Sequence, residues 1–162
     1  MKKDLGSEGE LFPQSVFIVA SYGEDGTPNA MNAAWAGECG NNEICLNIGN
    51  HKSTANIVAR RAFTVAPADV AHVVEADYFG IATGNKVDKA AASGMTFVKS
   101  EHVDARIVGR VVNTRVDESI LDDEGRVDFA KMRPIIYDST RRIYRVVGEE
   151  VGGAWDAGKK LL

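Results

Sequence analysis

The sequence predicts a mainly β protein, a small β-barrel with short helices, and not a doubly wound parallel sheet. Five or six short strand-like runs occur along the 162 residues, and only short helical patterns separate them. The first third of the chain consists of strands joined by turns, as in a β-meander. No internal repeat, low-complexity segment or linker divides the sequence, so we expect residues 1–162 to form a single domain.

The first third of the chain contains three predicted strands. The run SVFIVASY (residues 15–22) is apolar and rich in β-branched residues, and a proline and a glycine bound it. Asp25 and Gly26 predict a tight hairpin turn, which makes NAMNAAW (residues 29–35) the return strand. A third strand is predicted for EICLNIG (residues 43–49), where apolar and polar residues alternate.

The return strand has an unusual composition. Asn and Ala have low strand propensity, and packing alone would favour Val or Ile. Small residues leave room beside the backbone, and Asn supplies hydrogen-bonding groups. The composition therefore favours a site for a flat ligand with a polar edge, with Trp35 beside it.

Helices are predicted in the middle of the chain. Helical patterns cover STANIVARR, ADVAHVVEADYFG and KVDKAAASG, which are residues 53–61, 68–80 and 86–94. Ser53 or Thr54 is a suitable N-cap for the first helix, and Gly94 is expected to end the third. A short strand at residues 62–66 is predicted between the first two helices.

The last part of the chain returns to strands. The segment RIVGRVVNTRVD (residues 106–117) is long, alternating and β-branched, and RRIYRVV (residues 141–147) is a final strand. Between them, residues 118–136 are predicted to form a loop with an Asp-Glu-Gly turn and a short helix. Residues 151–162 are expected to form a tail.

Composition and charge exclude several classes of protein. The formal net charge of -4 argues against a nucleic-acid-binding surface, which usually carries a basic excess. No apolar run approaches the roughly 20 residues that a membrane span requires. The first ten residues contain two lysines but no apolar core behind them, which argues against a signal peptide. We therefore expect a cytoplasmic protein without a nucleic-acid or membrane partner.

The cysteines and histidines indicate neither a metal site nor a hydrolase. Cys39 and Cys45 flank a polar turn and are interpreted as small strand residues, because a disulfide scaffold or a zinc site would need more ligands or paired spacing. His51, His72 and His102 fit no metal motif. No nucleophile elbow, metalloprotease motif or nucleophile beside a His–Asp pair is present.

Two segments have compositions that suit a phosphate or a closely approaching ligand. In NHKSTANI (residues 50–57), Lys52 precedes two hydroxyl residues at a helix start, where free amides and a cation favour an anion. A capped surface helix with a solvated lysine is the alternative, and this segment taken alone favours it, because N-caps occur on most helices. In ATGNKVDK (residues 82–89), small residues leave room for a ligand that Lys89 would reach. Taken alone, this segment favours the alternative of a simple junction between a loop and a helix. The spacing is not that of a P-loop.

In order and spacing, these segments resemble one family. The stretches VFIVAS, DGTPNAMNAAW, LNIGNHKST, ADYFGIATGNKVDK and VDESILDDEG…RPIIYD are similar to the flavin reductase-like, FMN-binding split-barrel proteins. That family includes flavoredoxins and related NAD(P)H:flavin oxidoreductases. The resemblance runs over most of the chain, from about residue 12 to residue 152. It implies a Greek-key split β-barrel that forms a homodimer, with FMN near the subunit interface.

The resemblance also implies a set of FMN contacts. The residues implied to line the isoalloxazine ring and its polar edge are Asn29, Ala30, Met31, Asn32, Ala33, Ala34 and Trp35. Those implied to hold the ribityl chain and the phosphate are Asn47, Ile48, Gly49, His51, Lys52, Ser53 and Thr54, the last three as phosphate ligands. Those implied to close over the flavin are Ala82, Thr83, Gly84 and Lys89. Tyr144, on the last predicted strand, is a suggested contact for a second substrate.

The implied function is an FMN-dependent oxidoreductase that transfers electrons from NAD(P)H through FMN to a small-molecule or protein acceptor. The cofactor carries the chemistry, so no catalytic acid or base is expected from the chain. The sequence contains no G-x-G-x-x-G motif, so NAD(P)H would bind transiently over the flavin. The alternative is a flavoredoxin-type electron carrier that binds FMN but does not itself oxidise NAD(P)H.

The sequence departs from the family pattern in three places. Asn32 stands where the family often has Thr or Ser, which preserves hydrogen bonding, and VDKAAASG lacks the Phe common after Asp-Lys. Ala105 runs directly into Arg106, where family members usually have a proline and a further strand or two. A barrel without that piece would have an unpaired edge. We therefore expect that a segment is omitted between Ala105 and Arg106, which the intact mass of the native protein would test.

Overall fold

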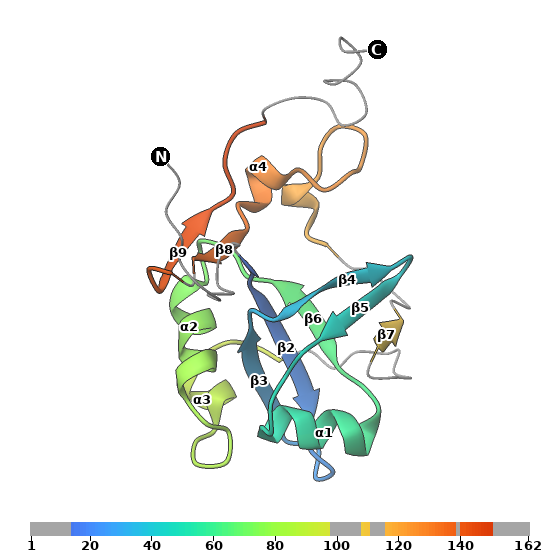
Figure 1. The fold of residues 1–162 in the computed structure, drawn as a ribbon, viewed down its shortest axis with the longest axis vertical. Coiled ribbons are helices and arrows are strands. Elements are labelled where there is room, and N and C mark those ends of the chain that lie inside the picture. The colour runs from blue at the N-terminus through green and yellow to red at the C-terminus, as the bar shows by residue number, and fades with distance from the viewer. Residues whose placement is uncertain (1–13, 98–107, 111–115, 139, 151–162) are drawn as a thin grey trace, which may run out of the picture.

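The structure, a computed structural model, describes residues 14–97, 108–110, 116–138 and 140–150 (Figure 1). The strands in these ranges are β1 (Gln14–Ser15), β2 (Phe17–Tyr22), β3 (Pro28–Ala33), β4 (Ala36–Gly40), β5 (Glu43–Leu46), β6 (Thr64–Pro67), β7 (Val108–Arg110), β8 (Ile135–Asp138) and β9 (Ile143–Val146). The helices are α1 (Lys52–Arg60), α2 (Val73–Ile81), α3 (Lys89–Ser93), the 3-10 helix η1 (Glu118–Ile120) and α4 (Phe129–Met132). The predicted mainly β architecture with short helices is confirmed.

The described strands form three small antiparallel sheets, with strand orders β1-β8-β9, β3-β2-β6 and β4-β5-β7. Strands from the beginning and the end of the chain therefore pair with each other. The sheet β3-β2-β6 lies at the centre, and the β4-β5 hairpin extends from it on the side away from α2 (Figure 1).

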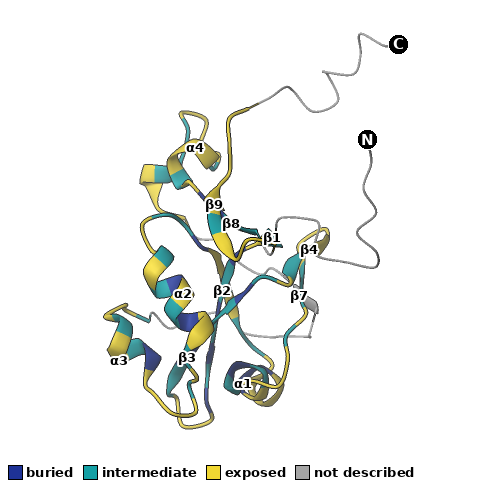
Figure 2. Ribbon diagram, turned by 60° about the vertical axis from the view of Figure 1, so that its left-hand side comes forward, coloured by how far each residue is buried: buried dark blue, intermediate teal, exposed yellow. Residues whose placement is uncertain are grey.

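Two apolar clusters cover the two faces of the central sheet. Ile18 and Val19 are consecutive in β2, so their side chains point to opposite faces. Val19 packs with Ile57 of α1, and Ile18 packs against the cluster that contains Ala76 of α2. α1 and α2 consequently lie on different sides of β2 and β3 (Figure 2).

The predicted β2–β3 hairpin is confirmed, although its loop is longer than a two-residue turn. The Gly23 N–H donates to the Thr27 carbonyl at 2.9 Å, and this bond closes a loop of residues 23–27. Gly26 has a φ of 81°, which a side chain would strain. Asp25 accepts a hydrogen bond from the Thr27 N–H at 2.9 Å and fixes the turn.

β3 presents a free edge in the described part of the chain. Ala68 N–H donates to the Val16 carbonyl at 2.9 Å, so the even-numbered peptide groups of β2 point toward β6. Their register partners in β3, Ala30 and Asn32, therefore turn their N–H and C=O groups away from β2. β3 ends the strand order of its sheet, so these groups have no strand partner among the described residues.

Helix α1 begins earlier than predicted. Its N-cap is His51, and the His51 carbonyl accepts the first intrahelical bond from the Ala55 N–H at 3.1 Å. The prediction of Ser53 or Thr54 as N-cap is therefore wrong. The Thr54 hydroxyl instead reaches back from the first turn, accepting from the His51 N–H at 3.4 Å and donating to the Gly49 carbonyl at 2.5 Å. The bond from the His51 N–H to Thr54 is the half of a capping box that the third helical residue supplies.

Several other predicted boundaries change. α2 begins at Val73, five residues after the predicted start, because Ala68 bonds to Val16 and Asp69 forms a β-bridge with Pro134. Strands β4 and β8 were not predicted. α3 ends at Gly94 as expected, with a φ of 67°. The Ala105–Arg106 junction, most of the predicted strand 106–117 and the tail 151–162 lie outside the described residues.

Cys39 and Cys45 form a disulfide, so the prediction that they are unpaired strand residues is wrong. Both do lie in strands, β4 and β5. The intervening turn contains Asn42 with a φ of 60°, and the β4–β5 register shifts between Glu38 and Gly40. This irregularity places the two Cα atoms 5.8 Å apart, within the usual disulfide range. Spacing in the sequence alone did not reveal the bulge.

Asp138 organises the turn between β8 and β9, which makes the hairpin acid-sensitive. Its carboxylate accepts from the Thr140 hydroxyl at 2.7 Å, from Arg145 Nε at 3.1 Å and from the Arg141 N–H at 3.2 Å. These hydrogen bonds, with that of Thr140 foremost, lower the pKa of Asp138 from 3.8 to about 2. A carboxyl group whose pKa is depressed in the folded state stabilises the fold at pH values above its ordinary pKa. This stabilisation is lost as the pH falls through the folded-state pKa.

We expect Asp138→Asn to reduce the acid sensitivity of folding. In the unmodified protein, the Asp138 contribution to the free energy of unfolding should disappear as pH falls from 3.8 to about 2. The variant lacks this titration, so its unfolding free energy should change less over the same interval. Urea unfolding followed by circular dichroism measures the unfolding free energy of the unmodified protein and of the variant at each pH. Asp123→Asn, on an exposed loop, is the control. Equal pH slopes for the unmodified protein and Asp138→Asn would contradict the expectation.

Candidate functional site

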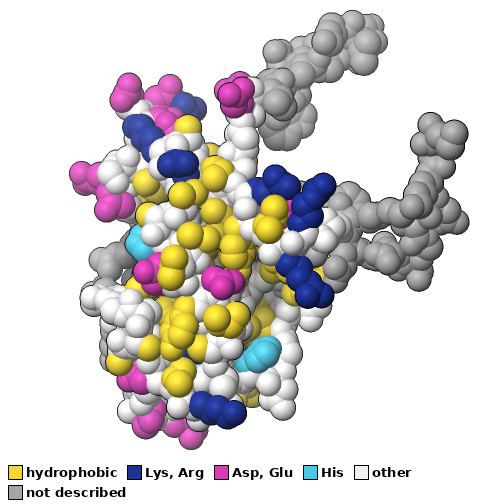
Figure 3. Space-filling model, turned by 90° about the vertical axis from the view of Figure 1, so that its left-hand side faces the viewer, with side chains coloured by type: hydrophobic (Ala, Val, Ile, Leu, Met, Phe, Trp, Pro, Cys, Tyr) yellow, Lys and Arg dark blue, Asp and Glu magenta, His cyan; other side chains and the backbone are white. Residues whose placement is uncertain are grey.

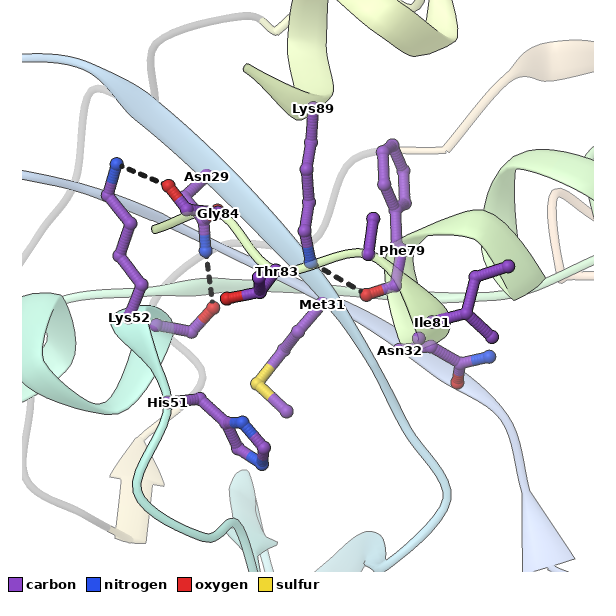
Figure 4. A pocket seen from close by; sticks show the side chains of 13 residues that line it. Asn29, Met31, Asn32, His51, Lys52, Phe79, Ile81, Thr83, Gly84 and Lys89 are labelled. Carbon is purple, nitrogen blue, oxygen red and sulfur yellow. Dashed lines mark hydrogen bonds between the residues drawn. The ribbon is translucent and has the colours of Figure 1, made fainter. Parts of the chain in front are cut away.

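A cavity of about 250 Å³ lies along the free edge of β3, between the start of α1 and the end of α2 (Figure 4). The residues that line it are Asn29, Met31, Asn32, His51, Lys52, Ser53, Phe79, Gly80, Ile81, Ala82, Thr83, Gly84 and Lys89. They come from β3, the start of α1, the end of α2 with its following loop, and α3. The fold thus brings together all three segments that the sequence singled out.

Ten of the eighteen predicted FMN contacts line this cavity, and eight do not. The eight are Ala30, Ala33, Ala34, Trp35, Asn47, Ile48, Gly49 and Thr54. Ala33 and Ile48 pack in the core around Val19. β3 ends at Ala33, and the bend that follows leaves Trp35 53 % exposed. Phe79, Gly80 and Ile81 line the cavity although they were not predicted, because the helical pattern gave no sign that the end of α2 reaches β3.

One end of the cavity is held together by two hydrogen bonds between distant segments. The side-chain amide of Asn29 donates from Nδ2 to Ser53 Oγ at 2.7 Å, and both residues are buried. Lys52 Nζ donates to the Gly84 carbonyl at 3.0 Å (Figure 4). These bonds fasten the start of α1 and the loop after α2 to β3. The Ser53 hydroxyl accepts from Asn29, so its own hydrogen remains available as a donor.

Gly84 is required by the closeness of this packing. A Cβ atom at this position would lie 1.9 Å from Asn29 Oδ1 and 3.2 Å from Lys52 Cδ. The first distance is far inside van der Waals contact. The small-residue loop therefore serves to bring its backbone against Asn29 and Lys52.

Lys89 is a buried cation at the centre of the site, with 4 % of its surface exposed. Its ammonium group donates to the Phe79 carbonyl at 2.8 Å and to the Ala30 carbonyl at 2.9 Å, which ties α3 to α2 and to the free edge of β3. Burial lowers the pKa of Lys89. An ammonium group has a further N–H donor beyond these two bonds. Within the described ranges, the Lys89 cation bonds only to neutral carbonyls, and such a buried cation favours a nearby anion.

The lining of the cavity is electropositive although the whole chain carries a net charge of -4. Lys52 and Lys89 line it with His51, and none of the described lining residues is Asp or Glu. The first-turn amides of α1 point from the helix end without intrahelical partners and add a partial positive charge. The site therefore suits an anionic ligand.

The other end of the cavity has apolar walls and a polar edge. Met31, Phe79 and Ile81 supply apolar surface, and the free peptide groups of Ala30 and Asn32 lie along β3. Lys89 occupies the Ala30 carbonyl, and the Ala30 N–H and the N–H and C=O of Asn32 have no hydrogen-bond partner among the described residues. This arrangement suits a flat ring that carries hydrogen-bonding groups along one edge.

Tyr144 lies behind this wall and does not line the cavity. Its hydroxyl accepts from Asn32 Nδ2 at 3.2 Å and donates to Asp77 Oδ1 at 3.0 Å. Its suggested contact with a second substrate is a prediction that none of these contacts tests.

No helix in the described ranges is both long and apolar enough to cross a membrane. No group of three or more His, Cys, Asp or Glu side chains in the same ranges is arranged to hold a metal ion.

Solved structures place the chain in a family, whereas no protein-family model and no curated protein matches it. The flavoredoxin of Desulfovibrio vulgaris (Miyazaki F) is 36% identical and superposes with a TM-score of 0.91, over 98% of this chain and 100% of its own. The chain belongs to the flavin reductase-like, flavoredoxin family. The predicted family and its split-barrel fold are confirmed.

More distant members share the fold. A flavoredoxin from Methanosarcina acetivorans is 21% identical with a TM-score of 0.88, and each chain is covered over 100% of its length. An FMN-binding protein from Thermus thermophilus is 18% identical with a TM-score of 0.72, over 94% of this chain and 98% of its own. In the present flavoredoxin-family protein, the cavity lies where β3, α1 and α2 meet.

Proposed function

We propose that this protein binds FMN in the cavity along β3 and passes electrons through it. The observation that carries the proposal is the lining of the cavity: two lysines, a histidine and no described acidic residue, at the N-terminus of a nine-residue helix. FMN joins a phosphate to a flat ring with a polar edge, and the two ends of the cavity match these two parts. Family membership supports the same ligand, because the relative from Thermus thermophilus is an FMN-binding protein.

In this proposal, the end near α1 holds the phosphate. Lys52 supplies a cation, Ser53 a hydroxyl donor and the first turn of α1 its free amides. Thr54 does not line the cavity, but its two hydrogen bonds fix the start of α1 in place. Asn47, Ile48 and Gly49 lead into this helix and retain their proposed role near the ribityl chain, with His51 lining the cavity.

The isoalloxazine ring is proposed to lie against the free edge of β3. Its polar edge would meet the peptide groups of Ala30 and Asn32, and Met31 and Ile81 would contact its apolar part. Lys89 would face the negative charge that builds up on the ring when FMN is reduced. When bound, FMN supplies the redox chemistry by accepting a hydride or electrons and passing them on.

A homodimer is part of the proposal because the cavity is small and open. About 300–1,000 Å³ is usual for ligand pockets, so the 250 Å³ cavity leaves part of FMN to be covered from outside. Apolar side chains gather on the neighbouring α2 face (Figure 3), where Val74 is 74% exposed and Ile81 77% exposed. A second copy would cover both this face and the remaining parts of FMN. Ala34 and the exposed Trp35 are assigned to those remaining parts, whereas Ala33 packs in the core. Sedimentation equilibrium tests this assembly, and a monomer with bound FMN would contradict it.

The phosphate site is tested by comparing FMN with riboflavin, which lacks the phosphate. We expect Lys52→Ala to weaken FMN binding by about ten- to a hundredfold, since charge-assisted bonds to phosphate contribute roughly 1.5–3 kcal/mol. Riboflavin binding should change little. Fluorescence titration measures both affinities, and Lys86→Ala, an exposed lysine outside the cavity lining, is the control. Equal loss for both ligands would show that Lys52 supports the fold and not the phosphate.

The electron donor separates two forms of the proposed function. A reductase would take electrons from NADH or NADPH, whereas a carrier would receive them from a protein partner. The carrier is favoured by the relative at 36% identity, which is named a flavoredoxin. Anaerobic mixing of the FMN-loaded protein with NADH or NADPH distinguishes the two by the flavin absorbance. Bleaching supports the NAD(P)H:FMN oxidoreductase, and no bleaching with either nicotinamide supports the carrier. A cytoplasmic location, and a small-molecule or protein acceptor, complete the proposal.

A further inference from the structure

Behind the polar edge of the cavity, three side chains from distant segments form a hydrogen-bonded row. Asn32 on β3 donates from Nδ2 to the Tyr144 hydroxyl on β9 at 3.2 Å. The Tyr144 hydroxyl donates to Asp77 Oδ1 on α2 at 3.0 Å. Only Asn32 lines the cavity, so Tyr144 and Asp77 form a second layer behind it.

The chemistry of the three groups fixes the direction of the row. A carboxylate can only accept, so the single hydroxyl hydrogen of Tyr144 must go to Asp77. The Tyr144 oxygen must then accept from Asn32, and only the amide NH₂ can donate. The reverse orientation of the Asn32 amide would need a second hydrogen on the tyrosine. The amide oxygen of Asn32 is therefore the atom left for other partners.

The surroundings hold this arrangement in place. Tyr144 packs against the core cluster of Val16 and Ile135, and its ring centroid lies 5.8 Å from that of Tyr137. Burial, with the Asp77 carboxylate next, raises the pKa of Tyr144 to about 12, so the hydroxyl keeps its hydrogen at neutral pH. On the other side, a Cβ atom at Gly80 would lie 3.4 Å from Asn32 Cβ, so α2 closely adjoins Asn32.

We propose that Tyr144, held by Asp77, is a positioning residue that orients the Asn32 amide so that its oxygen accepts an N–H of the ligand. The inference rests on the proposed binding of FMN. Oxidised FMN has one ring N–H, at N3, between two carbonyl groups. Asn32 Oδ1 would accept that hydrogen, and the Asp77–Tyr144–Asn32 row would thereby select a ring with an unsubstituted N3.

The position of Asn32 along β3 agrees with this assignment. Asn29, three residues earlier, bonds to Ser53 at the proposed phosphate end. A strand advances by about 3.3 Å per residue, so Asn32 lies roughly 10 Å along β3 from Asn29. A ribityl chain separates the phosphate from the ring over a similar length, which places Asn32 beside the ring.

The test compares FMN with 3-methyl-FMN, in which a methyl group replaces the N3 hydrogen. Dissociation constants for both compounds are measured by fluorescence titration for the unmodified protein and for Tyr144→Phe, Asn32→Ala and Asp77→Ala. Tyr137→Phe, which removes a hydroxyl from the adjoining ring, is the matched control. Asp77 is exposed, so its variant keeps the test valid if Tyr144→Phe does not fold.

We expect the unmodified protein and Tyr137→Phe to bind 3-methyl-FMN at least about tenfold more weakly than FMN, because the half-buried Asn32 oxygen loses its partner and meets a methyl group. Tyr144→Phe and Asn32→Ala should reduce this ratio to less than about threefold, because the amide is then free to turn or is absent. Asp77→Ala frees the tyrosine hydrogen to reach Asn32, so it should lower the ratio in the same direction.

The outcomes separate this inference from the proposed function. If the unmodified protein binds neither compound, the proposed function fails. If it binds both compounds equally, FMN binding stands and the role of Asn32 is overturned. If it discriminates and the ratio stays unchanged in Tyr144→Phe, Asn32→Ala and Asp77→Ala, a backbone group reads N3 and the positioning role of Tyr144 is overturned.

Discussion

Replacing Gly84 with alanine is expected to lower FMN affinity by about a hundredfold or more, the equivalent of roughly 2.7 kcal/mol. The added Cβ would lie 1.9 Å from Asn29 Oδ1, so either the loop or Asn29 must move. Movement of Asn29 breaks its bond to Ser53, and movement of the loop breaks the bond between Lys52 and the Gly84 carbonyl. Either change disrupts the proposed phosphate end of the site.

The measurement is an FMN titration of the purified apoprotein, together with its thermal unfolding. Overpacking of this kind typically costs about 1–3 kcal/mol of stability, so the variant should fold but melt earlier. Gly37→Ala is the matched control, because a Cβ atom there meets nothing within 4 Å. FMN affinity within about twofold of the unmodified protein would show that the ligand does not depend on this contact.

Replacing Lys89 with methionine is expected to weaken FMN binding by about ten- to a hundredfold, and to weaken binding of reduced FMN further. The methionine keeps most of the volume but removes the buried cation and its bonds to the Ala30 and Phe79 carbonyls. Reduced FMN carries more negative charge on its ring, so the lost cation should matter more in that state. The midpoint potential of the bound flavin should therefore fall, by about 30 mV for each tenfold difference between the two affinities.

Spectroelectrochemical titration under anaerobic conditions measures that potential, and fluorescence titration measures the affinity for oxidised FMN. Lys86→Met is the control, because Lys86 lies in the loop that leads into α3 but is exposed and outside the cavity lining. An unchanged potential in Lys89→Met, with FMN still bound, would place Lys89 away from the ring. In Lys89→Met, the affinity for riboflavin should fall in parallel with the affinity for FMN. This distinguishes the role of Lys89 at the ring from that of Lys52 at the phosphate, whose loss should leave riboflavin binding nearly unchanged.

Much of the candidate site follows from local sequence patterns combined with family resemblance. The sequence and the resemblance assign Asn29 to Asn32, the HKS segment and the ATG loop to one ligand, and most of these residues line the same cavity. The end of α2 was missed, because residues 68–80 carry a helical pattern that says nothing about which strand the helix approaches. Trp35 was assigned to the ring wall, yet a bend after Ala33 leaves it exposed.

The sequence by itself determined features that depend on neighbouring residues. The β-branched run of β2, the turn at Gly26 and the end of α3 at Gly94 follow from side-chain period and from backbone angles that glycine adopts without strain. The family was likewise readable from the order of short motifs. These signals are local, because each depends on a few consecutive residues.

Only the tertiary structure decided which distant groups meet. Asn32 and Tyr144 are 112 residues apart, yet one hydrogen bond between them sets the direction of the Asn32 amide. Lys89 is an ordinary lysine in the sequence and becomes a buried cation because α3 packs beside β3 and α2. Burial and hydrogen-bond partners arise from the packing of separate segments, and a local pattern contains no information about the segment that will lie against it.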